Sequence, residues 1–138
     1  MLAAPGRNSI GVRRAMKGYP SLADHPLTGS ASRKRVCIAT LEFPGVCQNG
    51  DVGTAFHALA VALASRGHDV TVLFLGDRLD GGDEAHWRSH FSAAGLRFVH
   101  LPRHPPATDR DSRAAETAFN CYRWLSGHRF DIVHFHEI

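Results

Sequence analysis

The chain has 138 residues, 43% of them hydrophobic and 21% charged, which is enough for one domain with a sizeable core. The net charge of +3 is uneven, because residues 1–35 hold seven basic residues against one acid and the remainder holds 9 basic against 12 acidic residues. The basic excess therefore belongs to a leader, and no nucleic-acid partner is expected. The three cysteines match no metal or disulfide pattern, and no apolar run approaches the ~18 residues of a membrane span, which indicates a cytoplasmic protein without a transmembrane segment.

Residues 1–34 are rich in Gly, Pro, Ser and Arg and lack periodicity, which predicts a disordered basic leader before a domain at 35–138. From Arg35 on, short apolar runs alternate with segments of helical periodicity. This alternation predicts an α/β fold, a Rossmann-like doubly wound parallel sheet with helices on both faces. We expect strands at 36–41, 70–75, 96–101 and 131–135, and helices at 54–66, 83–94 and 112–126.

Local signals mark the ends of the helices. Gly67 and Gly95 are placed to end the first two helices, and Asp83 is placed to cap the second. The third helix is expected to bury one apolar stripe, formed by Ala115, Ala118, Phe119, Tyr122 and Leu125.

The loop between the first strand and the first helix is one candidate site. Its glycines Gly50 and Gly53 permit close approach of backbone to a ligand, and the start of the helix presents unpaired N–H groups that suit a phosphate, carboxylate or sugar oxygen. The alternative is that both glycines serve only a turn and a close helix–sheet contact. With Gly45, their spacing differs from the dinucleotide fingerprint, and no P-loop lysine follows.

The end of the last strand is the second candidate site. His134 and His136 lie two residues apart and share a face while the strand continues, with Glu137 next to them. We expect His134 to be a partly buried, hydrogen-bonded histidine and His136 to be functional. A His-x-His pair could also bind zinc with a third ligand, but no clear ligand cluster is evident and no metal is predicted.

Four segments in order resemble the N-terminal domain of a GT-B glycosyltransferase of family 4, close to the glycogen and starch synthases. Each segment is moderately specific, and their order and spacing are more so. The resemblance covers roughly residues 35–138. Its four segments are the first strand with its Glu-Phe-Pro turn (38–44), the glycine loop (50–55), the helix–Gly-His–strand segment (59–73) and the Phe-Asp-Ile-Val-His-Phe-His-Glu end (130–137).

The resemblance implies transfer of a sugar, with retention, from a nucleotide-sugar donor to a glycan or small-molecule acceptor, without a required metal or other cofactor. It implies that His136 lies near the reacting sugar as the catalytic residue. It further implies substrate binding by the glycine loop and the strand tip, through Gly50, Asp51, Gly53, Thr54, His134 and Glu137.

Two departures limit what the resemblance implies. Asp51 stands where the family has a second glycine, and Gln48 replaces the lysine of the synthases, so synthase activity is not expected and donor contact at this loop is in doubt. We also expect a truncated chain that lacks the C-terminal Rossmann-like donor domain and is inactive alone. Two alternatives remain open: a metal-dependent hydrolase that uses His134 and His136, and a non-catalytic α/β binding module.

Overall fold

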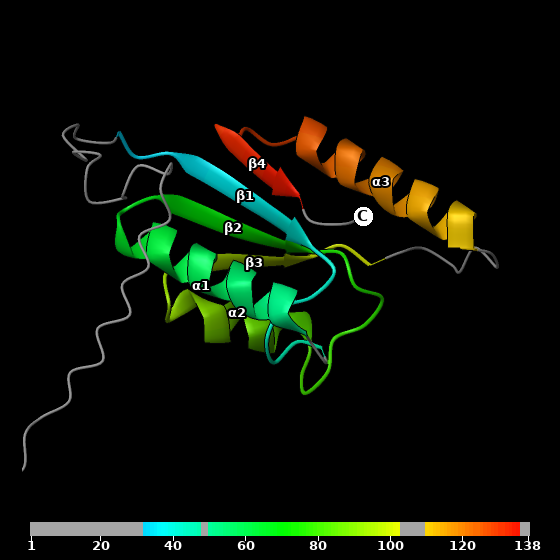
Figure 1. Ribbon diagram of the computed structural model, residues 1–138, viewed down its shortest axis with the longest axis horizontal. Helices are drawn as coiled ribbons and strands as arrows, with labels where there is room; N and C mark the ends of the chain where they lie inside the picture. Colours follow the sequence, from blue (N-terminus) through cyan, green and yellow to red (C-terminus); the bar gives the residue numbers. More distant parts are fainter. Residues whose placement is uncertain (1–31, 48–49, 103–109, 136–138) are drawn as a thin grey trace, which may run out of the picture. The chain divides into compact units, whose positions relative to one another are not determined.

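The structure is a computed structural model and describes residues 32–47, 50–102 and 110–135. Strands and helices alternate along these segments in the predicted order: β1 (Arg35–Thr40), α1 (Asp51–Ser65), β2 (Asp69–Phe74), α2 (Glu84–Ser92), β3 (Leu96–His100), α3 (Arg110–Ser126) and β4 (Ile132–Phe135). The strands form one parallel sheet in the order β3-β2-β1-β4 (Figure 1). The predicted Rossmann-like α/β arrangement is confirmed.

Helices cover both faces of the sheet, with α1 and α2 on one face and α3 on the other (Figure 1). Alternate strand residues point to opposite faces, so each strand contributes to two cores. The larger core, below α1 and α2, includes Ile38, Val72, Phe74, Phe98 and Trp87. The smaller core, below α3, contains Cys37, Ala39, Leu73, Leu75 and Cys121.

The helix caps follow the sequence signals. The Asp83 carboxylate accepts a hydrogen bond of 2.8 Å from the His86 N–H and caps α2 as predicted. Gly67, directly after the last cap residue of α1, has φ +86°, and Gly95, just beyond α2, has φ +75°. Both glycines therefore adopt the left-handed conformation that ends helices.

The first helix begins three residues earlier than predicted. It starts at Asp51, with Gly50 as an extended N-cap whose φ is −96°. Asp51 and Gly53 therefore lie in the first helical turn, where an acidic side chain is favoured by the helix dipole, and not in a loop. Gly53 is buried there, as a close helix–sheet contact requires.

The predicted apolar stripe of α3 is wrong except at Leu125. Phe119 and Tyr122 are 58% and 68% exposed, whereas Thr117 and Cys121 are buried. The buried side continues through Trp124 and Leu125, which pack against the smaller core. The large aromatic residues misled the prediction because two small side chains, at i and i+4, allow the helix to lie closer to the sheet.

The three cysteines are free thiols in two different environments. Burial, with Cys121 nearby, raises the pKa of the Cys37 thiol to about 12, and burial raises the pKa of Cys121 as well. The half-buried Cys47 lies in the loop after β1. Because only thiolates attack disulfides, an aromatic disulfide reagent at neutral pH should modify Cys47 in the native protein and all three thiols after unfolding. Rapid native modification of Cys37 would show that α3 does not cover it.

No helix within the described residues is long and apolar enough to cross a membrane.

Candidate functional site

The carboxyl ends of the four parallel strands meet at one edge of the sheet, which we call the carboxyl edge. Between β1 and β4 the strand order reverses, because β2 and β3 follow on one side of β1 and β4 lies on the other. Ligands of doubly wound sheets bind beyond the carboxyl ends near such a switch point. The structure therefore brings together the loop after β1 and the end of β4, the two segments singled out in the sequence.

The loop after β1 is anchored to the body of the domain. The buried Thr40 hydroxyl donates to the Glu42 carbonyl at 2.9 Å and accepts from the Glu42 N–H at 3.2 Å, which fixes the first turn. Phe43 is fully buried, with its ring 5.0 Å edge-to-face from Phe91 and 5.5 Å from His57. Val46 is buried as well, so the loop is held by its apolar side chains.

The side chain of Glu42, from the loop after β1, lies at the start of α1. Its Oε2 accepts a hydrogen bond of 3.1 Å from the Gly50 N–H, beside the helix N-terminus that was predicted to receive a phosphate, carboxylate or sugar oxygen. A carboxylate is therefore already present at the positive end of this helix. A Cβ on Gly50 would meet Glu42 Oε2 at 3.7 Å, and the negative φ shows that the glycine is not needed for a left-handed turn. The Thr54 hydroxyl turns back toward the Gly50 carbonyl at 3.4 Å.

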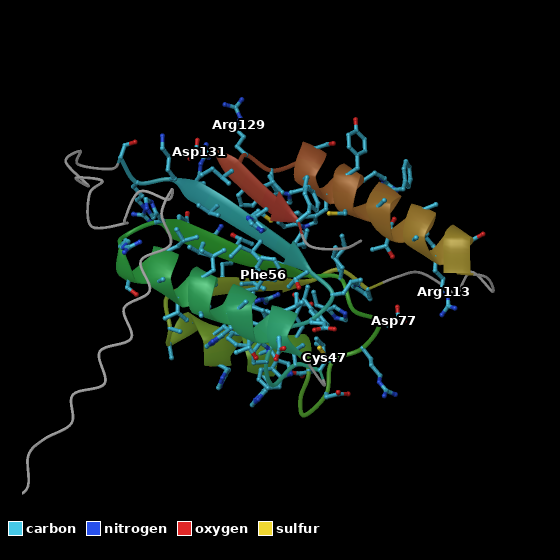
Figure 2. All side chains as sticks on the ribbon, in the orientation of Figure 1. Cys47, Phe56, Asp77, Arg113, Arg129 and Asp131 are labelled. Atoms are coloured by element: carbon cyan, nitrogen blue, oxygen red, sulfur yellow. The ribbon has the colours of Figure 1, made fainter. Side chains whose placement is uncertain are left out.

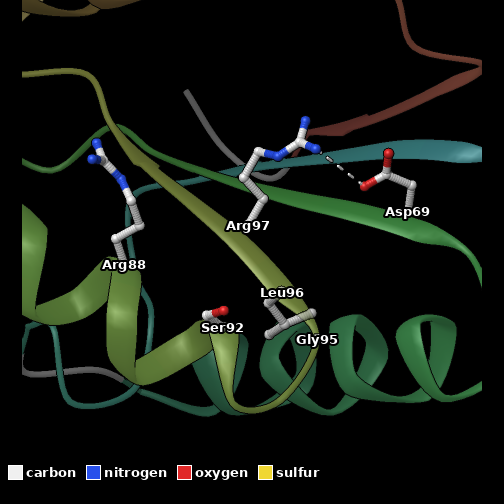
Figure 3. A pocket seen from close by; sticks show the side chains of 6 residues that line it. All are labelled: Asp69, Arg88, Ser92, Gly95, Leu96 and Arg97. Carbon is white, nitrogen blue, oxygen red and sulfur yellow. Dashed lines mark ion pairs between the residues drawn. The ribbon is translucent and has the colours of Figure 1, made fainter.

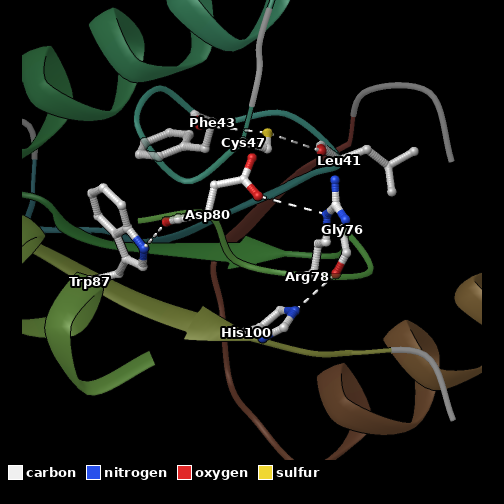
Figure 4. Close-up of polar contacts among 8 residues, drawn as sticks. All are labelled: Leu41, Phe43, Cys47, Gly76, Arg78, Asp80, Trp87 and His100. Carbon is white, nitrogen blue, oxygen red and sulfur yellow. Dashed lines mark hydrogen bonds and ion pairs between the residues drawn. The ribbon is translucent and has the colours of Figure 1, made fainter. Parts of the chain in front are cut away.

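The loop after β2 is tied to the same edge (Figure 4). The Trp87 Nε1–H donates to the Asp80 carbonyl at 2.9 Å, and the Asp80 N–H donates to the Val46 carbonyl at 2.7 Å. His100 Nε2 lies 2.8 Å from the Gly76 carbonyl. These contacts connect the loops after β1 and β2 with the end of β3, so the carboxyl edge is structured on this side.

Acidic side chains gather at the carboxyl edge. Two cations among the described residues are paired with these acids, since Arg78 lies 3.7 Å from Asp80 and Arg88 lies 2.8 Å from Glu84. Such an edge favours neutral, hydroxyl-rich ligands, whose hydroxyl groups donate to carboxylates, over a diphosphate. Within the described part of the chain, the acids on or beside its loops are Glu42, Asp51, Asp77, Asp80, Asp83 and Glu84.

His134 lies on the α1 face of β4, and the prediction that it is partly buried is wrong. The side chain is exposed, and its ring contacts Phe56 of α1 edge-to-face at 5.1 Å. The reason is that β4 forms a sheet edge within the described residues, where Ile132 is 50% exposed and Phe135 is 47% exposed. Figure 2 shows Phe56 on α1, below the sheet. This contact joins β4 to the first turns of α1, two residues beyond Thr54.

His136 and Glu137 lie outside the described residues, as does Gln48. Their predicted roles stay predictions. Among the residues that the structure describes, no three His, Cys, Asp or Glu side chains are grouped so that they could hold a metal ion. This finding does not extend to a zinc site that would include His136.

Residues 50–138 match the family model of the glycosyl transferase 4-like domain, which is more than half of the chain. The chain belongs to this family. The match includes α1 and the whole of β2 to β4, so the carboxyl edge described above is the edge of a GT-B-type glycosyltransferase 4-like domain. At the level of the family, its activity is glycosyl transfer. No curated protein matches the chain.

The contact of Glu42 with the start of α1 is a feature of this glycosyltransferase 4-like domain that the sequence did not predict. Glu42 precedes Gly50 by eight residues, and the loop must fold back before the two meet. The sequence feature that could have marked Glu42 as a site residue is its position, because it follows a buried strand closely at the edge where ligands bind.

Proposed function

We propose that this domain is the acceptor-side part of a glycosyltransferase that takes its sugar from a nucleotide-sugar. In this proposal the carboxyl edge binds hydroxyl groups of the acceptor, and the donor diphosphate is held by a C-terminal Rossmann-like domain. His136 would lie beside the reacting sugar, and Gly50, Asp51, Gly53 and Thr54 would shape the acceptor side. The domain without its donor partner would bind nucleotide-sugar weakly and transfer none.

The observation that carries the proposal is the Glu42 carboxylate on the Gly50 N–H. A donor phosphate at the start of α1 would have to displace this carboxylate and lie beside Asp51 in the first turn. Two negative charges near a diphosphate oppose its binding, whereas carboxylates accept hydrogen bonds from sugar hydroxyls without a charge penalty. The acid-rich carboxyl edge therefore fits an acceptor better than it fits a diphosphate.

A titration followed by amide NMR tests the proposal on the 138-residue chain. Uridine diphosphate should leave the amides of Gly50 to Thr54 unshifted in the native protein, because Glu42 and Asp51 repel it. In a Glu42→Gln, Asp51→Asn double variant the same ligand should shift these amides, and more strongly at low salt, where charges are less screened. Asparagine is chosen at Asp51 because glycine in the first turn would weaken α1 by about 1 kcal/mol.

Glu116→Gln is the control, since it removes one carboxylate from α3, on the other face of the sheet (Figure 1), and should leave the titration unchanged. Strong binding of uridine diphosphate at α1 by the native chain, or release of nucleoside diphosphate from a nucleotide-sugar by this chain alone, would overturn the acceptor-side assignment.

A further inference from the structure

The opposite edge of the sheet, where the strands begin, carries the reverse charge. A hollow of about 320 Å³ opens there between the starts of β1, β2 and β3 and the turn that joins α3 to β4. A second hollow of the same volume adjoins it and shares Asp69 and Arg97 (Figure 3). We call the first the basic hollow, and it is lined by Arg35, Asp69, Arg97, Gly127, His128, Arg129 and Phe130.

Two of the three arginines of the basic hollow have no acidic partner among the described residues, and the third, Arg97, is paired with Asp69. In the described segments, no carboxylate lies within ion-pair distance of the Arg35 or Arg129 side chain. The single acid, Asp69, lies 3.8 Å from Arg97, a long contact between an exposed guanidinium and a partly buried carboxylate (Figure 3). The nearby Asp131 carboxylate accepts a hydrogen bond of 2.7 Å from the Arg35 backbone N–H. The side chains lining the hollow thus carry an excess of two positive charges.

The carbonyl groups at the C-terminal end of α3 do not strongly repel an anion in the basic hollow. Carbonyls at a helix C-terminus carry partial negative charge when they lack partners. Here the Trp124 carbonyl accepts from the Gly127 N–H at 3.1 Å, and His128 Nδ1 lies 2.6 Å from the same oxygen. The Leu125 carbonyl accepts from the His128 N–H at 3.0 Å. These carbonyls are satisfied within the turn, and the arginines dominate the charge of the hollow.

We propose that the basic hollow binds a phosphate group. Guanidinium groups bind phosphate oxygens in pairs of parallel hydrogen bonds. Three arginines around one hollow, two of them without an acidic partner among the described residues, suit a dianion better than they suit a single carboxylate. The six residues of β1 separate the hollow from the carboxyl edge by roughly 20 Å, so its ligand is not the substrate of the candidate site. The phosphate belongs either to a soluble phosphate ester or to a phospholipid headgroup at a membrane surface.

Two probes, measured on the full chain, distinguish these sources. Inorganic pyrophosphate is titrated by calorimetry, and vesicles of phosphatidylcholine with and without phosphatidylglycerol are tested by co-sedimentation. Arg97→Gln should weaken pyrophosphate binding about tenfold, the usual effect of losing one charge-assisted contact. Asp69→Asn should strengthen it, since it removes the only acid of the hollow. Loss of binding to phosphatidylglycerol vesicles in Arg97→Gln would identify the lipid, and loss of pyrophosphate binding alone would identify a soluble ester.

Arg113→Gln is the matched control, because it removes the same charge near the other end of α3 (Figure 2). Its side chain is exposed, as are those of Arg35 and Arg97, so these variants should keep the native melting temperature. The basic residues before position 32 are present in every variant and cannot produce a difference between Arg97→Gln and Arg113→Gln. Arg35→Gln repeats the test if Arg97→Gln melts early. Equal binding by the native chain and all arginine variants, or binding of neither probe, would overturn the proposal.

Discussion

Replacing Gly45 by valine is expected to cost roughly 2–5 kcal/mol of unfolding free energy, enough to unfold much of a marginally stable domain. Gly45 has φ +84°, a conformation that a β-branched residue adopts only with strain. A Cβ at this position would also lie 3.0 Å from Cη2 of Trp87, whose side chain is buried and held by its hydrogen bond to Asp80. Backbone strain and overpacking therefore act together.

Gly67→Val separates the two contributions. Gly67 has nearly the same φ, +86°, but a Cβ there would meet nothing within 4 Å. The Gly67→Val variant should lose only about 1–2 kcal/mol of unfolding free energy, which is the cost of the strained backbone. Urea unfolding of both variants would give the difference as the cost of the contact with Trp87. Equal losses in the two variants would mean that the Trp87 ring moves aside at no cost.

The order and type of the elements could be predicted because they rest on local signals. The runs around Val36 to Leu41 and Val70 to Leu75 are apolar at nearly every position, as strands buried on both faces require, and the glycines at 67 and 95 mark the turns between elements. The predicted strand ends differ from the observed ones by at most one residue, within the usual variation of such boundaries.

The faces of the elements and the details of the site depend on tertiary contacts, which local patterns do not encode, and the predicted stripe of α3 failed for this reason. Phe119 and Tyr122 are large aromatic residues of α3, yet the helix turns Cys121 toward Cys37 of the sheet. Asp51 was predicted to lie in a loop because the helical spacing of apolar residues begins after it. The first turn of a helix can be polar, and α1 starts at Asp51. The pairing of Glu42 with Gly50 needs the whole loop to close, which no local pattern encodes.

Phe43→Ala should lower the unfolding free energy by about 3–5 kcal/mol, because it removes a fully buried ring from the larger core. It should also loosen the loop that presents Glu42, since the Phe43 ring fixes this loop against Phe91 and His57. Hydrogen exchange can follow the second effect at Gly50, whose N–H donates to Glu42. The expected result is exchange at this amide that is faster than the loss of global stability explains.

Phe98→Ala is the comparison that decides what Phe43 does. Phe98 is equally buried, 5.2 Å from the same Phe91 ring, but it lies on β3 and not on the loop. Both variants should lose similar stability in urea, and only Phe43→Ala should increase exchange at Gly50 beyond the global effect. If the two variants changed exchange at Gly50 alike, the loop would be held by its backbone turns at Thr40 and Val46, and Phe43 would serve the core alone.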